Sequence, residues 1–170
     1  QLSVGEKQRS IIMQYDLSIC IPSRNEEFIG ITVQNILDNI EGKTQIIVVL
    51  DGYDVPIPEI PEDPRVKVIK LEKSIGQRAG TNLAVKNSTA KYIMKCDAHV
   101  AFSKGFDRIL MEDMQDDWTV LPLMRNLWAF DWVCPDGHKR YQGPEGVCTE
   151  CGKETHKEIV WIGKNSPQST

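Results

Sequence analysis

Apolar and polar positions along the chain change their periodicity several times, and each change predicts a new element. Short apolar runs, typical of strands, alternate with stretches in which apolar residues recur every three or four positions, as in helices. The runs cover residues 17–22, 45–50, 66–71, 92–96 and 119–123, and the helical spacing covers residues 29–40, 76–87 and 106–114. This alternation predicts an α/β fold in which helices flank a mainly parallel sheet.

Polar residues follow three of these predicted strands directly. Residues 23–26 follow the first strand, Asp51 and Gly52 follow the second, and residues 97–99 follow the fourth. Because ligands of open parallel sheets bind beyond the carboxyl ends of the strands, we expect these segments to share one site. Structural roles are the alternative, since Asp-Gly is a common turn dipeptide and Glu26 suits the N-terminus of a helix.

Asp97 and His99 form the candidate metal-binding pair of this site. Residues two apart on an extended segment point the same way, so the carboxylate and the imidazole can meet one divalent ion. Carboxylate oxygen suits Mg²⁺ or Mn²⁺, and imidazole favours Mn²⁺ or a softer ion. Two protein ligands leave positions for diphosphate oxygens, whose developing charge the metal would stabilise. The alternative is a turn with an exposed histidine.

Residues 17–110 together resemble the family 2 inverting glycosyltransferases, which have the Rossmann-like GT-A fold. Residues 19–26 resemble the opening strand and the Pro-x-x-Asn-Glu turn of that family. Residues 46–52 resemble its second strand, which ends in an acidic motif, and residues 92–99 resemble the strand that carries the Asp-x-Asp metal motif. The Asp-x-His form is similar to that of the polypeptide N-acetylgalactosaminyltransferases, whose motif binds Mn²⁺.

The resemblance implies an enzyme that transfers a hexosyl or similar group, with inversion, from a nucleotide sugar to an acceptor hydroxyl. The donor is expected to be a UDP-sugar, with Mn²⁺ or Mg²⁺ as cofactor. Asp51 would accept the uracil N3 hydrogen, although Leu50 stands where the family's first acid usually lies. Neither the acceptor nor the catalytic base is identified. The donor-binding residues implied are Pro22, Ser23, Arg24, Glu26, Asp51, Gly76, Arg78, Gly80, Asn82 and Asp97, and His99 would bind the metal.

A second candidate metal site follows in the last third of the chain. Cys148 and Cys151 are separated by two residues and followed by glycine, as in a zinc knuckle, and Cys134 and His138 complete a set of four ligands. Four such ligands predict a closed, structural Zn²⁺ site. Free thiols, or His156 in place of His138, are the alternatives. The aromatic and polar residues around this loop would bind an acceptor or simply pack the loop: Trp128, Phe130, Asp131, Trp132, Arg140 and Tyr141.

Composition narrows the function classes further. The net charge of −4 disfavours a nucleic-acid-binding surface, and the absence of an apolar run of membrane-spanning length disfavours a membrane span. The cysteines are spaced like metal ligands, which argues against a secreted disulfide framework, so we expect a cytoplasmic protein. We expect a donor-binding domain over residues 1–125, a zinc-binding insert over 126–160 and a tail over 161–170, with the chain incomplete at its C-terminus.

Two other functional classes share these features. A nucleotidyltransferase, or another nucleotide-binding α/β enzyme, would also place acids and a metal at strand ends. A zinc-bearing binding module would use the α/β part as a scaffold, and a glycosyltransferase acting on DNA bases would combine both regions. Turnover of nucleoside triphosphates without sugar transfer distinguishes the first class, and binding of nucleic acid or protein by the metal loop distinguishes the second.

Overall fold

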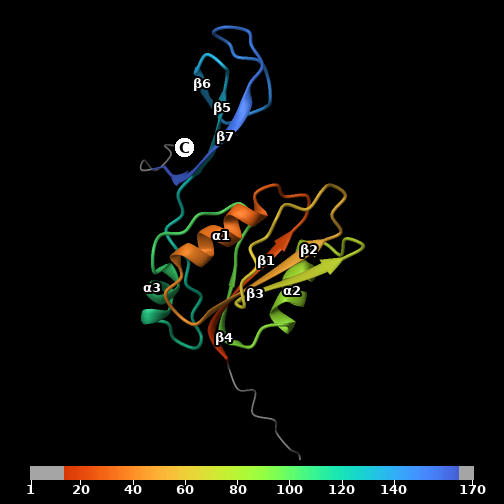
Figure 1. The fold of residues 1–170 in the computed structure, drawn as a ribbon. Helices are drawn as coiled ribbons and strands as arrows, with labels where there is room; N and C mark the ends of the chain where they lie inside the picture. Colours follow the sequence, from red (N-terminus) through yellow and green to blue (C-terminus); the bar gives the residue numbers. More distant parts are fainter. Residues whose placement is uncertain (1–13, 165–170) are drawn as a thin grey trace, which may run out of the picture. The chain divides into compact units, whose positions relative to one another are not determined.

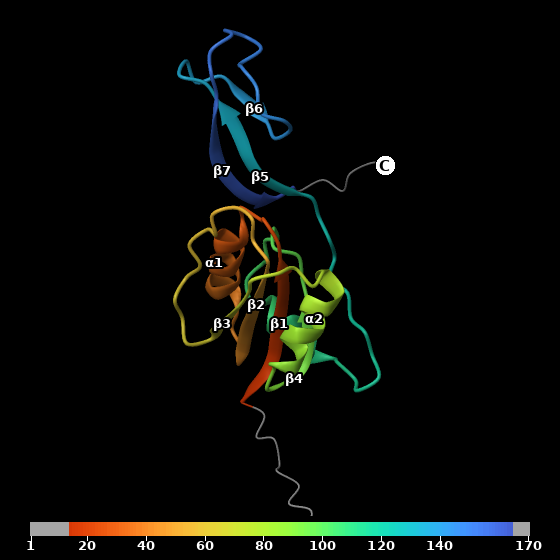
Figure 2. The ribbon, with the colours of Figure 1, turned by 90° about the vertical axis from the view of Figure 1, so that its right-hand side faces the viewer.

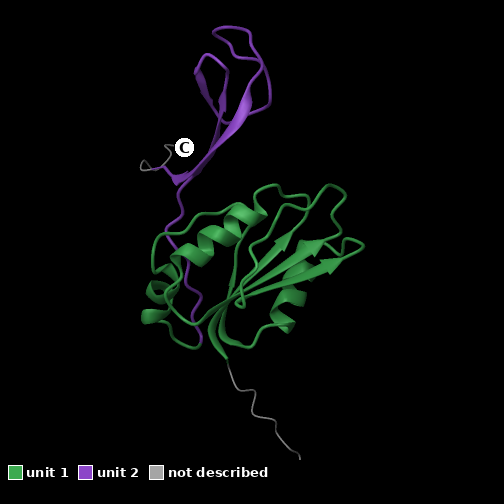
Figure 3. Cartoon of the chain, viewed as in Figure 1, with its two compact units in different colours: residues 1–116 green, residues 117–170 purple. Residues whose placement is uncertain are grey.

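The computed structural model describes residues 14–164 (Figure 1). The chain divides into two compact units, residues 1–116 and residues 117–170, shown in green and purple in Figure 3. The second unit therefore begins before residue 126, where we expected the metal-binding segment to start. Most of the expected tail, residues 165–170, lies outside the described residues. No helix in the described range is long and apolar enough to cross a membrane.

A parallel sheet of four strands forms the centre of unit 1 (Figure 1). The strand order is β3-β2-β1-β4, and all three neighbouring pairs are parallel. This confirms the α/β class predicted from the periodicity. The strands are β1 (Tyr15–Ser23), β2 (Thr44–Asp51), β3 (Val66–Leu71) and β4 (Ala90–Lys95), and the helices are α1 (Ile29–Asn39), α2 (Gln77–Lys86) and α3 (Phe106–Glu112).

Apolar side chains cover both faces of this sheet. Alternate residues of β1 and β2 pack with α1 and with Phe106 of α3 on one face. The intervening residues, among them Cys20, Ile47 and Val49, pack with Ala84 of α2 on the other. Figure 2 shows α1 and α2 on opposite sides of the sheet. Because strand side chains alternate between faces, central strands with helices on both sides are apolar at nearly every position.

A buried carboxylate joins α3 to the start of β2. Asp107 is fully buried, and its Oδ2 accepts hydrogen bonds from Thr44 Oγ1 at 2.7 Å and from the Gly42 amide at 2.9 Å. The Glu41 amide donates to Oδ1 at 3.1 Å. Burial raises the pKa of Asp107, but these hydrogen bonds outweigh burial and hold the pKa below its ordinary value. The carboxyl group of Asp107 is therefore ionised in the folded chain, where neighbouring hydrogen-bond donors stabilise its charge.

One predicted strand is wrong. Residues 119–123 form no strand, and the side chains of Leu121 and Leu123 are more than four-fifths exposed. Pro122 lacks the amide hydrogen that a sheet ladder requires, which explains why the apolar run alone was misleading. The next strand, β5 (Leu127–Val133), begins beyond this segment.

Unit 2 contains a small antiparallel sheet in the order β6-β5-β7. It is formed by β5, β6 (Lys139–Tyr141) and β7 (His156–Gly163). In the described part of this unit, the buried apolar residues are few and lie mainly in and after β5: Ala129, Trp132, Val133, Cys134 and Cys148. The unit therefore has a much smaller core than unit 1.

Candidate functional site

The strand order of unit 1 places its topological switch point between β1 and β4. The chain proceeds from β1 outwards to β2 and β3, and then returns to place β4 on the other side of β1. Doubly wound sheets usually bind their ligands at such a point, beyond the carboxyl ends of the strands. The segments at this point are residues 23–26 after β1 and residues 97–99 after β4.

The turn after β1 is stabilised by its own side chains. Asn25 has a left-handed backbone (φ 53°), which asparagine tolerates better than most residues. Its Oδ1 accepts a hydrogen bond from the Asp54 amide at 2.9 Å, and Arg24 pairs with the Asp54 carboxylate at 3.1 Å. Pro22 and Ser23 are buried, whereas Arg24 is exposed. The turn is thus fixed against the segment that follows β2.

Tyr53 is a site residue that the sequence analysis missed. Its hydroxyl forms a short hydrogen bond with Ser23 Oγ and accepts one from the Glu26 amide at 3.3 Å. Tyr53 directly follows Asp51 and Gly52, so an aromatic residue next to a strand-end acid was the available signal. Its partners lie 27 and 30 residues away along the chain and become visible only when β1 and β2 pair.

Asp97 and His99 lie in the segment after β4, where their spacing predicts that both side chains point the same way. Burial alternates along this segment: Cys96 and Ala98 are buried, whereas Asp97 and His99 are exposed. The Nδ1 atom of His99 lies 2.9 Å from Glu26 Oε2, so the ends of β1 and β4 are joined directly by these two side chains. The carboxylate of Asp97 is paired with Lys95.

Asp51 is buried and holds the loop that leads into α2. Its carboxylate accepts hydrogen bonds from Ser74 Oγ at 2.8 Å and from the amides of Ile75 and Gly76 at 2.7 and 2.9 Å. Burial raises the pKa of Asp51, but these hydrogen bonds outweigh it and lower the pKa. Gly52 allows the close approach, since a Cβ there would lie 2.4 Å from the Ser74 nitrogen.

The remaining predicted donor-binding residues lie at or within α2. Gly76 precedes the helix with a left-handed backbone (φ 87°). Gly80 is buried, and a Cβ there would lie 3.5 Å from the Cβ of Pro22, so this glycine lies where α2 packs on β1. Arg78 and Asn82 are exposed. The side chain of Arg78 makes no ion pair or hydrogen bond within residues 14–164, which leaves its guanidinium available for a ligand.

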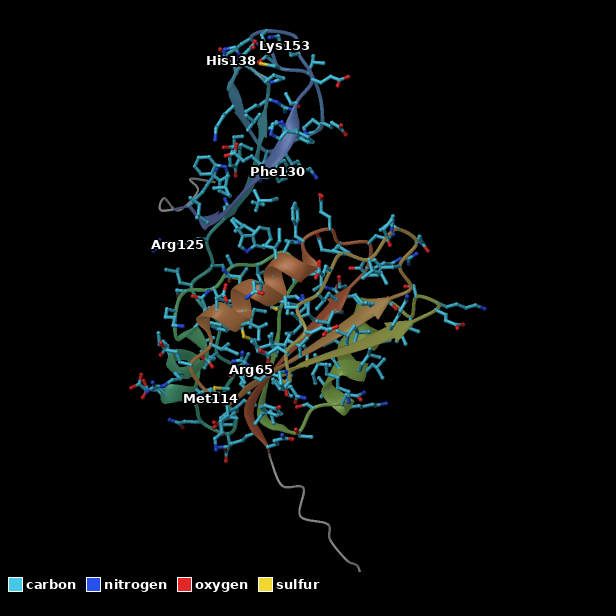
Figure 4. The ribbon with its side chains drawn as sticks, in the orientation of Figure 1. Arg65, Met114, Arg125, Phe130, His138 and Lys153 are labelled. Atoms are coloured by element: carbon cyan, nitrogen blue, oxygen red, sulfur yellow. The ribbon has the colours of Figure 1, made fainter. Side chains whose placement is uncertain are left out.

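The four predicted zinc ligands come together in unit 2. The ligand atoms of Cys134, His138, Cys148 and Cys151 all lie within 4.8 Å of one another. Within the described part of the chain this is the one set of three or more such residues that are mutually this close, and His156 is not in it. Figure 4 shows His138 and Lys153 at the same end of the unit. Asp97, His99 and Glu26 do not form an equally tight set.

Comparison with known proteins assigns the chain to a family. A family model described as glycosyl transferase family 2 matches residues 18–131, which include the parallel sheet apart from the first three residues of β1, and the three polar segments at its carboxyl edge. The match ends before the first ligand of the cysteine cluster. None of the curated proteins matches the chain. The match covers two-thirds of the chain, and the sheet order and the polar strand ends agree with it. The chain therefore belongs to glycosyl transferase family 2.

Proposed function

We propose that the chain transfers a sugar, with inversion, from a UDP-sugar to an acceptor hydroxyl, and that a divalent cation at Asp97 and His99 assists the departure of UDP. Family membership supports the glycosyltransferase activity and a nucleotide-sugar donor. It also favours sugar transfer over the nucleotidyltransferase alternative. The proposal places the donor at the carboxyl ends of β1 and β4.

The observation that carries the metal assignment is the pairing of Glu26 with His99. A histidine that binds a metal usually gives its other ring nitrogen to a carboxylate, which fixes the orientation of the ring. Here Nδ1 of His99 lies 2.9 Å from Glu26 Oε2, which leaves Nε2 for a metal. In this proposal Glu26 is a positioning residue for His99, and the contact with His99 Nδ1 supports that role.

The donor atoms fit a hard to borderline cation. Asp97 offers carboxylate oxygen and His99 offers imidazole nitrogen, and both side chains are exposed at the strand end. This set suits Mn²⁺ better than Mg²⁺ because Mg²⁺ strongly prefers oxygen ligands. When bound, the cation stabilises the negative charge on the departing diphosphate. Lys95, which pairs with Asp97, adds a positive charge beside the same carboxylate.

The residues around α2 are suited to the nucleotide part of the donor. Arg78 lies in the first turn of α2, exposed and without a partner in the described range, and a guanidinium pairs well with phosphate. Asp51 holds the segment before this helix through hydrogen bonds from the Ser74 hydroxyl and from the Ile75 and Gly76 amides. A carboxylate has about four acceptor positions, so Asp51 retains capacity for the uracil N3 hydrogen that the family resemblance implies.

A thermal-shift panel of nucleotide sugars tests the proposal, with each compound measured with and without Mn²⁺. UDP-sugars are expected to stabilise the wild-type chain only when Mn²⁺ is present. Asp97→Asn and His99→Ala are expected to abolish this shift, and Glu26→Ala is expected to weaken Mn²⁺ binding about 10- to 100-fold. Asp38→Asn is the matched control, because the carboxylate of Asp38 lies on α1 and accepts a hydrogen bond from Gln34 Nε2 at 2.8 Å.

Two results would overturn the proposal. One is a shift by UDP-sugars that is equally large without Mn²⁺ and in Asp97→Asn, which would remove the metal from donor binding. The other is the absence of a shift by any nucleotide sugar. Turnover of nucleoside triphosphates without sugar transfer would favour the nucleotidyltransferase alternative instead.

A further inference from the structure

We propose that Cys134, His138, Cys148 and Cys151 bind one Zn²⁺ ion in a closed tetrahedral site, and that this ion holds unit 2 in its fold. The site is separate from the donor site and belongs to the other unit. It lies beyond the segment that the family match covers, so family membership does not account for it.

The distances between the ligand atoms fit a zinc tetrahedron. With Zn–S bonds of about 2.3 Å and Zn–N bonds of about 2.05 Å, the edges of a tetrahedron are about 3.8 Å between two sulfurs and about 3.6 Å between sulfur and nitrogen. The sulfurs of Cys151 and Cys134 lie 3.6 Å apart. His138 Nδ1 lies 3.5 Å from Cys134 Sγ and 3.6 Å from Cys148 Sγ. A disulfide would instead bring two sulfurs to about 2.05 Å.

Two tight turns present these ligands. In the first, the Gly137 amide donates to the Cys134 carbonyl at 2.9 Å, and the Cys134 amide donates to the His138 carbonyl at 3.2 Å. Gly137 has a left-handed backbone (φ 83°), so the turn bends back and brings His138 towards Cys134. This turn connects β5 to β6, whose pairing fixes its two ends.

The second turn repeats this arrangement. The Gly152 amide donates to the Cys148 carbonyl at 2.8 Å, the Cys148 amide donates to the Lys153 carbonyl at 2.8 Å, and Gly152 is left-handed (φ 72°). Lys153 also forms an ion pair with Asp136 of the first turn, so the two turns are held side by side. Both pairs of ligands therefore face one point.

A carboxylate next to His138 supports a role as metal ligand. Because Nδ1 of His138 faces the sulfurs, its Nε2 is the outer nitrogen, and it lies 3.6 Å from Glu150 Oε2. An outer carboxylate of this kind orients a metal-bound imidazole. Glu150 lies between the two cysteines of the second turn, so the turn that supplies two thiolates also supplies this positioning group.

Unit 2 needs such a cross-link because its apolar core is small. Cys134 and Cys148 are themselves two of the five buried apolar residues in its described part. Small domains with little burial usually depend on disulfides or a metal for stability, and the free energy of metal binding then becomes folding free energy. Four protein ligands leave no open position, which makes the site structural rather than catalytic.

The two metal sites of the chain differ in hardness. The ligands in unit 2 are three sulfurs and one nitrogen, which prefer Zn²⁺, whereas Asp97 and His99 offer oxygen and nitrogen. The unit 2 ion should therefore remain bound when Mn²⁺ is added or removed. Three reduced thiolates also require a reducing compartment, and we include a cytoplasmic location in the proposal for that reason.

Metal analysis of the full chain tests the proposal. The wild-type protein, purified without chelator, is expected to contain one zinc per chain by plasma mass spectrometry. His138→Ala is expected to lose most of this zinc, whereas the matched variant His156→Ala is expected to retain it. A zinc content near zero in the wild type would overturn the proposal, and equal retention in His138→Ala and His156→Ala would overturn the ligand set.

Cobalt provides a readout that does not depend on how well a variant folds. Co²⁺ added to the metal-free wild-type chain is expected to give the intense visible absorption of a tetrahedral thiolate site, and one equivalent of Zn²⁺ should abolish it. A weak octahedral spectrum would contradict the assignment. Because this spectrum reports unit 2 alone, its failure would leave the donor-binding proposal intact, and loss of donor binding would leave the spectrum unchanged.

Discussion

Two strands of equal length show how differently the two units are stabilised. All eight residues of β2 in unit 1 are buried, whereas none of the eight residues of β7 in unit 2 is buried. Parallel strands covered by helices on both faces bury every side chain, but the antiparallel strand β7 lies at the edge of a three-stranded sheet. Apolar burial therefore stabilises unit 1, and the zinc ion that we propose for unit 2 would supply a cross-link where burial is small.

Metal removal should produce the largest difference in stability between the two units. Structural zinc sites contribute on the order of 10 kcal/mol to folding, so a strong chelator is expected to unfold unit 2 and leave unit 1 folded. All four tryptophans lie at residues 118–161, in unit 2, so tryptophan fluorescence reports this unit selectively. The fluorescence spectrum should shift to the red, while far-UV circular dichroism retains the helical signal. An unchanged tryptophan spectrum in metal-free protein would contradict the account.

Truncation of one isoleucine in each unit measures the difference in burial. Ile47 of β2 is fully buried, and Ile47→Ala is expected to destabilise unit 1 by about 3 kcal/mol. Ile159 of β7 is 46% exposed, so Ile159→Ala is expected to cost unit 2 about 1 kcal/mol or less. Urea unfolding followed by circular dichroism for unit 1 and by tryptophan fluorescence for unit 2 gives both values. Equal losses would mean that burial does not distinguish the units.

Removal of the charge on Asp107 should have the next largest effect. Asp107→Asn preserves the size of the side chain but replaces a charged acceptor of several hydrogen bonds, which is expected to destabilise unit 1 by about 2 kcal/mol. Asp113→Asn, an exposed carboxylate just after α3, is the matched control and should change the urea midpoint little. A midpoint for Asp107→Asn that equals the control would refute the role of Asp107.

Acid should weaken unit 1 in a defined direction. The pKa values of Asp51 and Asp107 are lower in the folded chain than their ordinary values, because hydrogen bonds to each carboxylate outweigh the effect of burial. Their contribution to stability is therefore complete above the unfolded pKa of about 4, and it is lost as pH falls through the folded values. The urea midpoint of unit 1 should fall as pH decreases from about 6 to about 3, and less steeply in Asp107→Asn. A urea midpoint that rises as pH decreases over this range would contradict the stabilising role of the two ionised carboxylates.

The smallest effect is expected from a surface ion pair of unit 2. Lys139 and Glu158 join β6 and β7 at 2.8 Å, but both side chains are about half exposed. Because solvent screens such exposed pairs, Lys139→Ala should hardly change the unfolding of unit 2 when the metal is bound. A loss comparable to that caused by chelation would show that surface charges, rather than the metal, stabilise this unit.

Periodicity was sufficient to predict the parallel sheet of unit 1 but not the segment that follows it or the strands of unit 2. The strand predicted over residues 66–71 has the observed bounds, because its pattern is local. The strand predicted over residues 119–123 fails because burial of its apolar side chains depends on partners that the segment lacks within the described residues. The residues 127–133 were interpreted as an aromatic cluster, and their strand character depends on pairing with β7, more than 20 residues later.

In the candidate site, too, local spacing could be interpreted from the sequence, whereas contacts between distant residues could not. The spacing of Asp97 and His99 was enough to predict two exposed side chains that alternate with buried residues, and Cys96 and Ala98 are buried while Asp97 and His99 are exposed. The pairing of His99 with Glu26 joins residues 73 positions apart and needs the strand order, as does the contact of Tyr53 with Ser23. Asp107 was missed because a single aspartate within an amphipathic helix carries no sign of the donors that surround it after folding.

Calorimetric titration of the chain with UDP tests the central claim most directly. Added Mn²⁺ should be varied without a chelator, because a chelator would also remove the zinc that we propose for unit 2. We predict that UDP binds the wild-type chain only in the presence of Mn²⁺ and binds Asp97→Asn and His99→Ala at least about tenfold more weakly, while Asp38→Asn binds as the wild type does. Equal affinity for UDP with and without Mn²⁺, unchanged in Asp97→Asn, would contradict a metal-dependent donor site at the carboxyl ends of β1 and β4.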